Sequence, residues 1–139
     1  MADTLTPQGR SERMSRIRGK DTGPEMALRR ALHAMGLRYR LHVRDLPGRP
    51  DLVFPSRKAV VFVHGCFWHQ HDGCSIANVP KSNVTYWQAK FMANRARDAR
   101  TTRRLRALGW RVIVVWECGL TTNAKVATTS VRVARLLTK

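Results

Sequence analysis

A segment near the middle of the chain carries an unusual density of side chains that can do chemistry. It is His64-Gly65-Cys66-Phe67-Trp68-His69-Gln70-His71. Imidazole groups transfer protons near neutral pH or bind metal ions, and a thiolate binds soft metal ions. Adjacent aromatic rings in a loop can stack on nucleic-acid bases or enter the core. The segment therefore predicts that metal binding, proton transfer and ring stacking take place around one loop.

Four residues have the donor types of a closed metal site: Cys66, His71, Cys74 and Cys118. Three thiolates and one imidazole would complete a tetrahedral structural zinc site. An odd number of cysteines, three, argues against a disulfide framework. In the alternative interpretation, Cys66 and Cys118 are ordinary buried cysteines and His71 is simply exposed. The loop has too little apolar content to order itself, however, and this favours zinc.

Asp51 is a candidate ligand for a harder cation. It begins a predicted strand that pairs with the strand ending at Val63-His64. A carboxylate there, with a main-chain carbonyl at the end of the facing strand, would supply oxygen ligands for Mg²⁺. As a turn cap such an Asp would be ordinary, but the chain has only nine acidic residues and places this one beside His64 and His69. These two histidines are candidates for proton transfer and phosphate stabilisation, although a single His is more often structural.

Phe67, Trp68 and Trp87 are large rings in or next to irregular, cation-rich surroundings. Aromatic residues ordinarily belong to the core, and Trp110 and Trp116 fit that interpretation. Phe67 and Trp68 are adjacent in a loop that Cys66 and His71 would anchor, so we expect at least one ring to project outward. An exposed ring there could wedge between base pairs.

The charge balance indicates a polyanionic partner. The chain of 139 residues has 26 Lys and Arg against nine Asp and Glu, a formal net charge of +17. Nucleic acid is the expected partner, and no long apolar run or lipidation signal favours a membrane. The N-terminus lacks the apolar run of a secretory signal, which predicts a cytoplasmic location. We expect a flexible basic tail over residues 1–10 and a single domain over residues 11–139.

Hydrophobic periodicity predicts an α/β fold with a mixed, few-stranded sheet flanked by helices. A capping-box pattern at Thr22-Gly23-Pro24-Glu25 begins one helix, which ends at Gly36. The apolar segment 59–63 should be the central strand, and a strand–helix–strand crossover makes 111–116 parallel to it. The other predicted elements are helices at 11–18, 84–108 and 124–137 and strands at 37–43 and 51–54.

Three motifs together resemble the very short patch repair (Vsr) endonucleases. They are Leu46-Pro47-Gly48-Arg49-Pro50-Asp51, the segment from Val61 to His71, and the segment from Gly109 to Cys118. The resemblance extends from about Ser11 to Leu120 and is highly specific. Two features depart from the expected pattern: the spacing from His71 to Cys74 is one residue longer, and Phe62 and His64 stand where the wider nuclease superfamily has an acid and a lysine.

The resemblance implies a fold related to restriction endonucleases, a structural zinc ion and a Mg²⁺-dependent cut in one DNA strand. Members of the family nick 5′ to the thymine of a T·G mismatch that arises when 5-methylcytosine deaminates. By resemblance, Asp51 would bind Mg²⁺ together with the main-chain carbonyl of Val63. His69 would be the general base, and His64 and Glu25 would support the metal-bound waters and the phosphate.

The resemblance also implies how DNA would be recognised. The intercalating wedge beside the mismatch would be Phe67, Trp68 and Trp87, while Met14 and Lys90 would approach the mismatched pair and Asn94 would lie nearby. The implied partner is double-stranded DNA, with mismatch-repair proteins as further candidates and a monomer as the active unit. Two alternatives remain open: a Vsr-like restriction or homing endonuclease with another target, and a zinc-stapled DNA-binding protein without activity.

Overall fold

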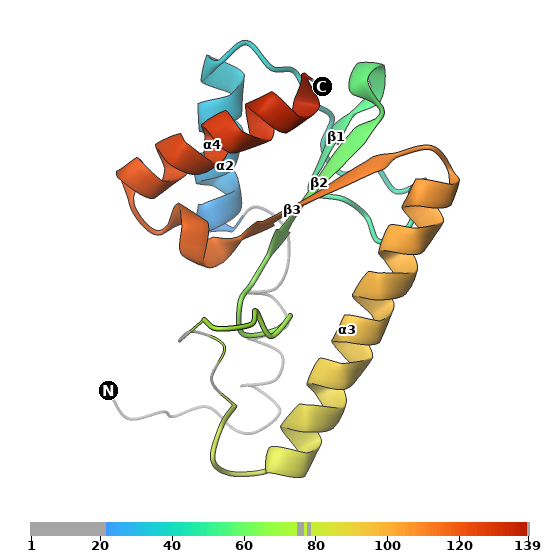
Figure 1. The fold of residues 1–139 in the computed structure, drawn as a ribbon, viewed down its shortest axis with the longest axis vertical. Coiled ribbons are helices and arrows are strands. Elements are labelled where there is room, and N and C mark those ends of the chain that lie inside the picture. The colour runs from blue at the N-terminus through green and yellow to red at the C-terminus, as the bar shows by residue number, and fades with distance from the viewer. Residues whose placement is uncertain (1–21, 75–76, 78, 139) are drawn as a thin grey trace.

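A three-stranded sheet forms the middle layer of the structure (Figure 1). The structure is a computed structural model that describes residues 22–74, 77 and 79–138. Strand β2 (Ala59–His64) lies between β1 (Leu52–Phe54), which is antiparallel to it, and β3 (Arg111–Trp116), which is parallel. The predicted mixed sheet and its central apolar strand are confirmed.

A tight connection joins β1 to β2. Pro55–Arg57 forms a single 3₁₀ turn, and Lys58 closes it in the left-handed region with φ of 51°. The register that follows pairs Leu52 with Val61 and Phe54 with Ala59. The predicted hairpin is therefore present, and it fixes the position of Asp51 at the outer end of β1.

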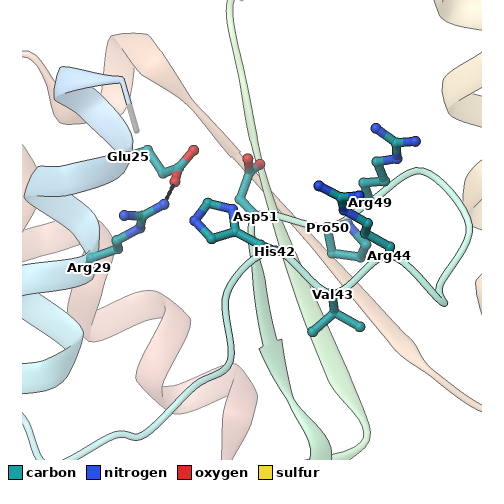
Figure 2. Close-up of a pocket in the computed structure, with 8 residues that line it drawn as sticks. All are labelled: Glu25, Arg29, His42, Val43, Arg44, Arg49, Pro50 and Asp51. Atoms are coloured by element: carbon teal, nitrogen blue, oxygen red, sulfur yellow. Dashed lines mark hydrogen bonds and ion pairs between the residues drawn. The ribbon is translucent and has the colours of Figure 1, made fainter. Parts of the chain in front are cut away.

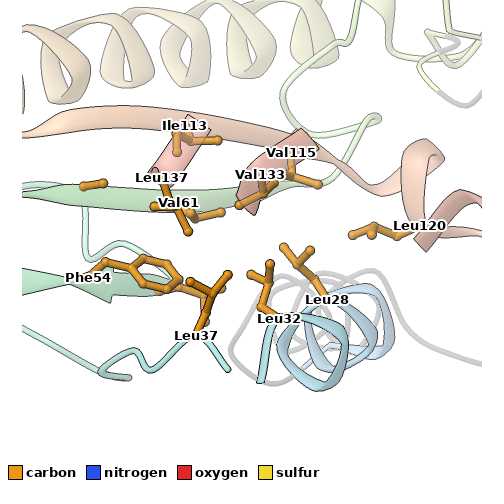
Figure 3. Packing of buried hydrophobic residues seen from close by; sticks show 12 residues of the cluster. Leu28, Leu32, Leu37, Phe54, Val61, Ile113, Val115, Leu120, Val133 and Leu137 are labelled. Carbon is orange, nitrogen blue, oxygen red and sulfur yellow. The ribbon is translucent and has the colours of Figure 1, made fainter. Parts of the chain in front are cut away.

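Helices cover both faces of the sheet (Figure 1). Helices α2 (Gly23–Ala34) and α4 (Asn123–Leu137) pack on one face, and the long helix α3 (Val84–Ala107) lies along the other. Successive strand residues point to opposite faces, so Val61 joins the core under α2 and α4 while Val60 and Phe62 join the core under α3. Figure 3 shows the larger core, in which leucines of α2 meet β2, β3 and α4.

Helix α2 begins as its sequence predicts. The Thr22 hydroxyl accepts a hydrogen bond from the Glu25 amide at 3.4 Å, and proline occupies the first turn. The Glu25 carboxylate forms an ion pair with Arg29 one turn later. The side chain of Glu25 is buried, and this places it toward the site rather than toward solvent.

The predicted strand over 37–43 is wrong. Only an isolated bridge between Arg40 and Val53 forms there, although Leu37, Tyr39 and Leu41 still pack against the core. The backbone of His42 has φ of 57°, a left-handed conformation that interrupts any extended pairing. Alternation therefore identified the inward-facing residues correctly but not the element.

Two predicted elements fall on residues that the structure does not describe. The predicted helix at 11–18, including Met14, and the tail at 1–10 lie outside the residues that the structure describes. Among the described residues, no helix is both long and apolar enough to cross a membrane.

Gly48 holds the loop before Asp51 against helix α3. Its φ is +75°, and a β-carbon added there would overlap the Thr101 Cγ2 atom. A residue with a side chain at this position would therefore be strained in its backbone and would also push the loop away from α3. The contact sets how close the Asp51 loop lies to the helix.

We expect Gly48→Ala to reduce the free energy of unfolding by about 1–3 kcal/mol more than Gly36→Ala. Gly36 is a matched control because its φ is +87° and a β-carbon there meets nothing within 4 Å. Urea denaturation of both variants measures the difference. Adding Thr101→Ala to Gly48→Ala should recover part of the loss, and equal losses in the two glycine variants would contradict the steric argument.

Candidate active site and metal centre

Asp51 lies at the outer end of β1, where β2 fixes both its main chain and its side chain. Its amide donates to the Val61 carbonyl at 3.0 Å, and its Oδ2 accepts from the Val63 amide at 2.6 Å. The carboxylate lines a pocket of about 40 Å³, enough for a few water molecules. In Figure 2 it lies between Glu25 on one side and Arg49 on the other.

The surroundings of Asp51 disfavour its charge. Burial raises the pKa of Asp51 from its usual 3.8 to about 7, and the neighbouring Glu25 carboxylate adds to the rise, while the Val63 amide opposes it. A bound cation would relieve both the desolvation and the repulsion between the two carboxylates. Two carboxyl groups facing a pocket of this size form a fitting set of hard oxygen donors for a divalent ion.

His64 and His69 stack face to face beyond the end of β2. Their ring centroids are 3.9 Å apart with an interplanar angle of 4°. Burial and, to a smaller extent, the nearby His69 lower the pKa of His64 from 6.5 to about 4, while Asp98 opposes the change, so His64 is neutral at physiological pH. Because the rings are stacked, each limits the rotation of the other.

His69 is oriented by an acid that the sequence interpretation did not select. Its Nδ1 lies 2.6 Å from the Asp98 Oδ2 on helix α3. A carboxylate at Nδ1 leaves Nε2 to accept a proton and stabilises the imidazolium that results. The available signal was that Asp98 is the single acid on a helix rich in Lys and Arg, an exception without a stated role.

The four predicted metal ligands come together. The Cys66, His71, Cys74 and Cys118 ligand atoms all lie within 4.8 Å of one another. The His71 Nδ1 is 3.7 Å from the Cys66 Sγ and 3.4 Å from the Cys118 Sγ. A tetrahedral zinc ion would place nitrogen and sulfur ligands about 3.6 Å apart, so the donor set and its spacing fit a closed metal centre.

The protein supports these ligands from outside. The Glu117 Oε1 accepts a hydrogen bond from the Cys66 amide at 2.9 Å, and the His71 ring stacks on Trp116 at 4.2 Å. Burial raises the pKa of the Cys66 thiol to about 12, so without a cation this thiol stays protonated. Binding of a metal ion would therefore release protons as the thiols become thiolates.

The aromatic residues form a cluster between the loop and the start of α3. Phe67, Trp68 and Trp87 contact one another with centroid distances from 5.2 to 5.9 Å, and Phe67 also contacts Phe91. The three predicted wedge residues are half-buried, so each keeps part of its ring surface accessible. The Lys90 Nζ lies 5.9 Å from the Trp68 ring.

Three residues on one face of α3 each contact a different residue of the loop. Phe91 contacts the Phe67 ring, the Asn94 side chain donates to the Trp68 carbonyl at 3.0 Å, and Asp98 binds His69. These helix positions are three and four residues apart and so lie on one side of the helix. A single helix face therefore fixes three consecutive loop residues, and Asn94 is the one that contacts Trp68.

The structure thus brings the predicted residues into three groups. Asp51 is beside Glu25 and bonded to the Val63 amide, the two catalytic histidine candidates are stacked, and the four metal ligands form one cluster. Val63 is half-buried and directly precedes His64 in the chain, which makes β2 the link between the first two groups. Met14 lies outside the described residues.

The fold resembles that of a known nuclease. The catalytic domain of the homing endonuclease I-Bth0305I superposes with a TM-score of 0.53, covering 83% of this chain and 93% of that domain. The two sequences are 18% identical, so this likeness shows the architecture. It confirms the expected restriction-like α/β fold.

The sequence comparisons are more specific. The family model described as DNA mismatch endonuclease Vsr matches residues 2–75. The chain is 57% identical over 120 residues to the type II nicking enzyme V.XorIIP of Xanthomonas oryzae, covering 86% of this chain and 88% of that enzyme. It is 42% identical over 126 residues to the DNA mismatch endonuclease Vsr of Escherichia coli, covering 91% and 80% respectively. The chain belongs to the Vsr DNA mismatch endonuclease family, and it is an endonuclease that acts on DNA.

The raised pKa of Asp51 predicts a pH-dependent cost of folding. Between pH 3.8 and about 7 the folded protein retains a proton that the unfolded chain has lost, so stability falls as the pH rises through this window. Asp51→Asn keeps an acceptor for the Val63 amide. It should raise the free energy of unfolding at pH 8 by up to about 4 kcal/mol and have little effect at pH 4.

Urea denaturation of both proteins across this pH range, without added divalent cation, measures the effect. Asp45→Asn is the matched control because Asp45 is exposed. A gain that does not change with pH, or a loss at pH 8, would contradict the predicted origin in burial.

The four-ligand cluster is expected to bind about one equivalent of a thiophilic divalent metal ion. His71→Gln should lose that metal and lower the melting temperature, because metal binding and folding are linked. The control is His33→Gln, which changes an exposed histidine on α2. Elemental analysis and thermal unfolding measure both effects. A metal content below about half an equivalent, or an unchanged melting temperature after chelation, would exclude a structural role.

Proposed function

We propose that this endonuclease nicks one strand of duplex DNA 5′ to the thymine of a T·G mismatch and so begins very short patch repair of deaminated 5-methylcytosine. Family membership and the E. coli relative, which is named a DNA mismatch endonuclease, support the substrate. One structural observation carries the chemistry. The main-chain amide of Val63 binds Asp51, and the next residue, His64, stacks on His69, which Asp98 holds.

In this proposal Asp51 and the main-chain carbonyl of Val63 would hold Mg²⁺, and Glu25 and His64 would support the metal-bound waters and the phosphate. Such an ion neutralises phosphate charge and acidifies bound water. The raised pKa of Asp51 supports the assignment, because a cation bound beside the Asp51 and Glu25 carboxyl groups would offset the burial that causes the rise.

His69 is the proposed general base. Its Nε2 takes a proton from the attacking water, and Asp98 at Nδ1 stabilises the imidazolium and fixes the ring. His64 remains neutral because its pKa is about 4, so it can contact a phosphate oxygen or a water without repelling the protonated His69. In this proposal His69 transfers the proton and His64 contacts the phosphate or a water.

Mismatch recognition is assigned to the aromatic cluster. Phe67, Trp68 and Trp87 would insert beside the T·G pair, since base stacking on aromatic rings compensates for local unstacking of the duplex. Lys90 lies over the Trp68 ring, and Asn94 donates a hydrogen bond to the Trp68 carbonyl; these contacts support a role for both beside the wedge. Met14 is proposed to approach the mismatch as well.

Zinc is the proposed occupant of the Cys₃His cluster, where it fastens the loop that carries both the wedge and the base. The proposal treats residues 11–139 as one domain that acts as a monomer, with mismatch-repair proteins as candidate partners. A second target class is favoured by the relatives named type II nicking enzymes, among them V.XorIIP and V.NmeAIP of Neisseria meningitidis. Nicking of fully paired sites would indicate that class.

The deciding experiment compares end-labelled duplexes that differ only in a T·G or a T·A pair, with Mg²⁺ or with a chelator. We expect a single nick 5′ to the mismatched thymine that requires Mg²⁺. Asp51→Ala should reduce the nicking rate by at least about 10²-fold, and His69→Ala by about 10²–10⁴-fold, the range for loss of a general base.

Asp45→Ala is the control, since it removes an exposed acid from the same loop region and should leave the rate within about twofold. Equal cutting of both duplexes would refute mismatch specificity. Full activity with Asp51→Ala would refute the assignment of the metal site.

A further inference from the structure

The indole of Trp116 contacts three imidazoles that belong to two different sites. The ring of the metal ligand His71 stacks on it, with centroids 4.2 Å apart and an interplanar angle of 7°. His64 meets it edge to face at 5.3 Å and 77°, and His69 lies at 6.3 Å and 73°. Trp116 is thus the aromatic residue that stands between the metal cluster and the histidine pair.

The sheet explains why Trp116 occupies this place. It is the last residue of β3, and the parallel register pairs it with His64, the last residue of β2. Paired residues on adjacent strands project to the same face, so the indole and the His64 imidazole must adjoin. The chain then continues directly into Glu117, which binds the Cys66 amide, and Cys118, a metal ligand.

The packing of Trp116 differs from that of an ordinary core residue. It is half-buried, and its described ring contacts are all with histidines. A parallel contact with His71 limits rotation of that ring, whereas the two perpendicular contacts support the edge of the His64–His69 stack. An aliphatic side chain could fill the volume but could not supply these ring-to-ring geometries.

We propose that Trp116 is a positioning residue that couples the metal centre to the catalytic histidines. It holds His71 in the orientation in which Nδ1 faces the thiols, and it holds His64 and His69 in their stacked arrangement. The catalytic half of this inference rests on the proposed function, because it takes His69 as the base. The metal half does not depend on the substrate.

The test compares Trp116→Leu, Trp116→Phe and Trp110→Leu in the zinc-loaded protein. Trp110 is the matched control because it lies just before the other end of β3, packs in the core under α3 and has Lys58 over its ring. Zinc release to a colorimetric chelator, the single-turnover nicking rate and the dissociation constant for DNA are measured for each. The imidazole signals of His64 and His69 are followed by NMR.

We expect Trp116→Leu to release zinc about 3–10-fold faster, the effect of losing one or two aromatic contacts. Its nicking rate at saturating DNA should fall by at least about tenfold, while DNA affinity changes by less than about threefold. The His64 and His69 signals should shift or broaden. Trp116→Phe, which keeps a flat ring, should recover most of both losses, and Trp110→Leu should leave zinc release and the histidine signals near those of the parent.

Equal effects of Trp116→Leu and Trp110→Leu would overturn the proposal, since they would reflect general loosening of the sheet. Unchanged zinc release in Trp116→Leu would overturn it as well. If Trp116→Leu fails to fold, Trp116→Phe must still show a measurable acceleration of zinc release or a change in the histidine signals. If Trp116→Leu releases zinc faster and changes the histidine signals, but the parent protein does not nick a T·G duplex, the proposed function is refuted and the coupling stands.

Discussion

Two parallel strands, β2 and β3, end side by side, and their ends place the histidine pair and the metal ligands. Six consecutive residue pairs link them, from Ala59 with Arg111 to His64 with Trp116. Beyond this edge β2 continues into the loop that carries Cys66 and His69, and β3 continues into the turn that carries Cys118. Since side chains alternate along a strand, a register shift of one residue would move the terminal imidazole to the opposite face of the sheet. The histidine pair and the metal cluster therefore share one geometric origin.

The buried acid Asp51 lowers the stability of the folded protein at neutral pH, whereas Asp98 interacts favourably with its surroundings. The protein carries a net charge of +17, yet it buries Asp51 beside a second carboxyl group, Glu25, which is paired with Arg29. That arrangement disfavours the folded state at neutral pH unless a cation or a proton is present. At the other group, Asp98 on a basic helix neutralises local charge while it orients His69. Acids are few in this chain, and the described ones that are buried or paired lie mostly around the site.

Much of the fold could be predicted because its signals are local. Uninterrupted apolar residues identified β2 and β3, the intervening long helix implied their parallel pairing, and the donor types of Cys66, His71, Cys74 and Cys118 implied a common cluster. The strand predicted over 37–43 failed since its alternation was real but the left-handed backbone of His42 is invisible in the pattern. The His69–Asp98 pair was missed for a different reason. The two residues are 29 positions apart, and their contact depends on the rotation of α3 about its own axis. Trp116 was expected in the core, but it is half-buried and packs against His64, its partner on the adjacent strand.

The match between Phe91, Asn94 and Asp98 and the three loop residues they contact limits which changes of chain length this protein can accept. An insertion or deletion between Phe67 and His69 would displace either the rings or the imidazole from its helical partner, and no rotation of α3 could restore both. The same change just before Val84 or beyond Asp98 would leave the relative spacing of the three contacts unchanged. The spacing between the wedge and the base is therefore a stricter constraint on this loop than its length elsewhere.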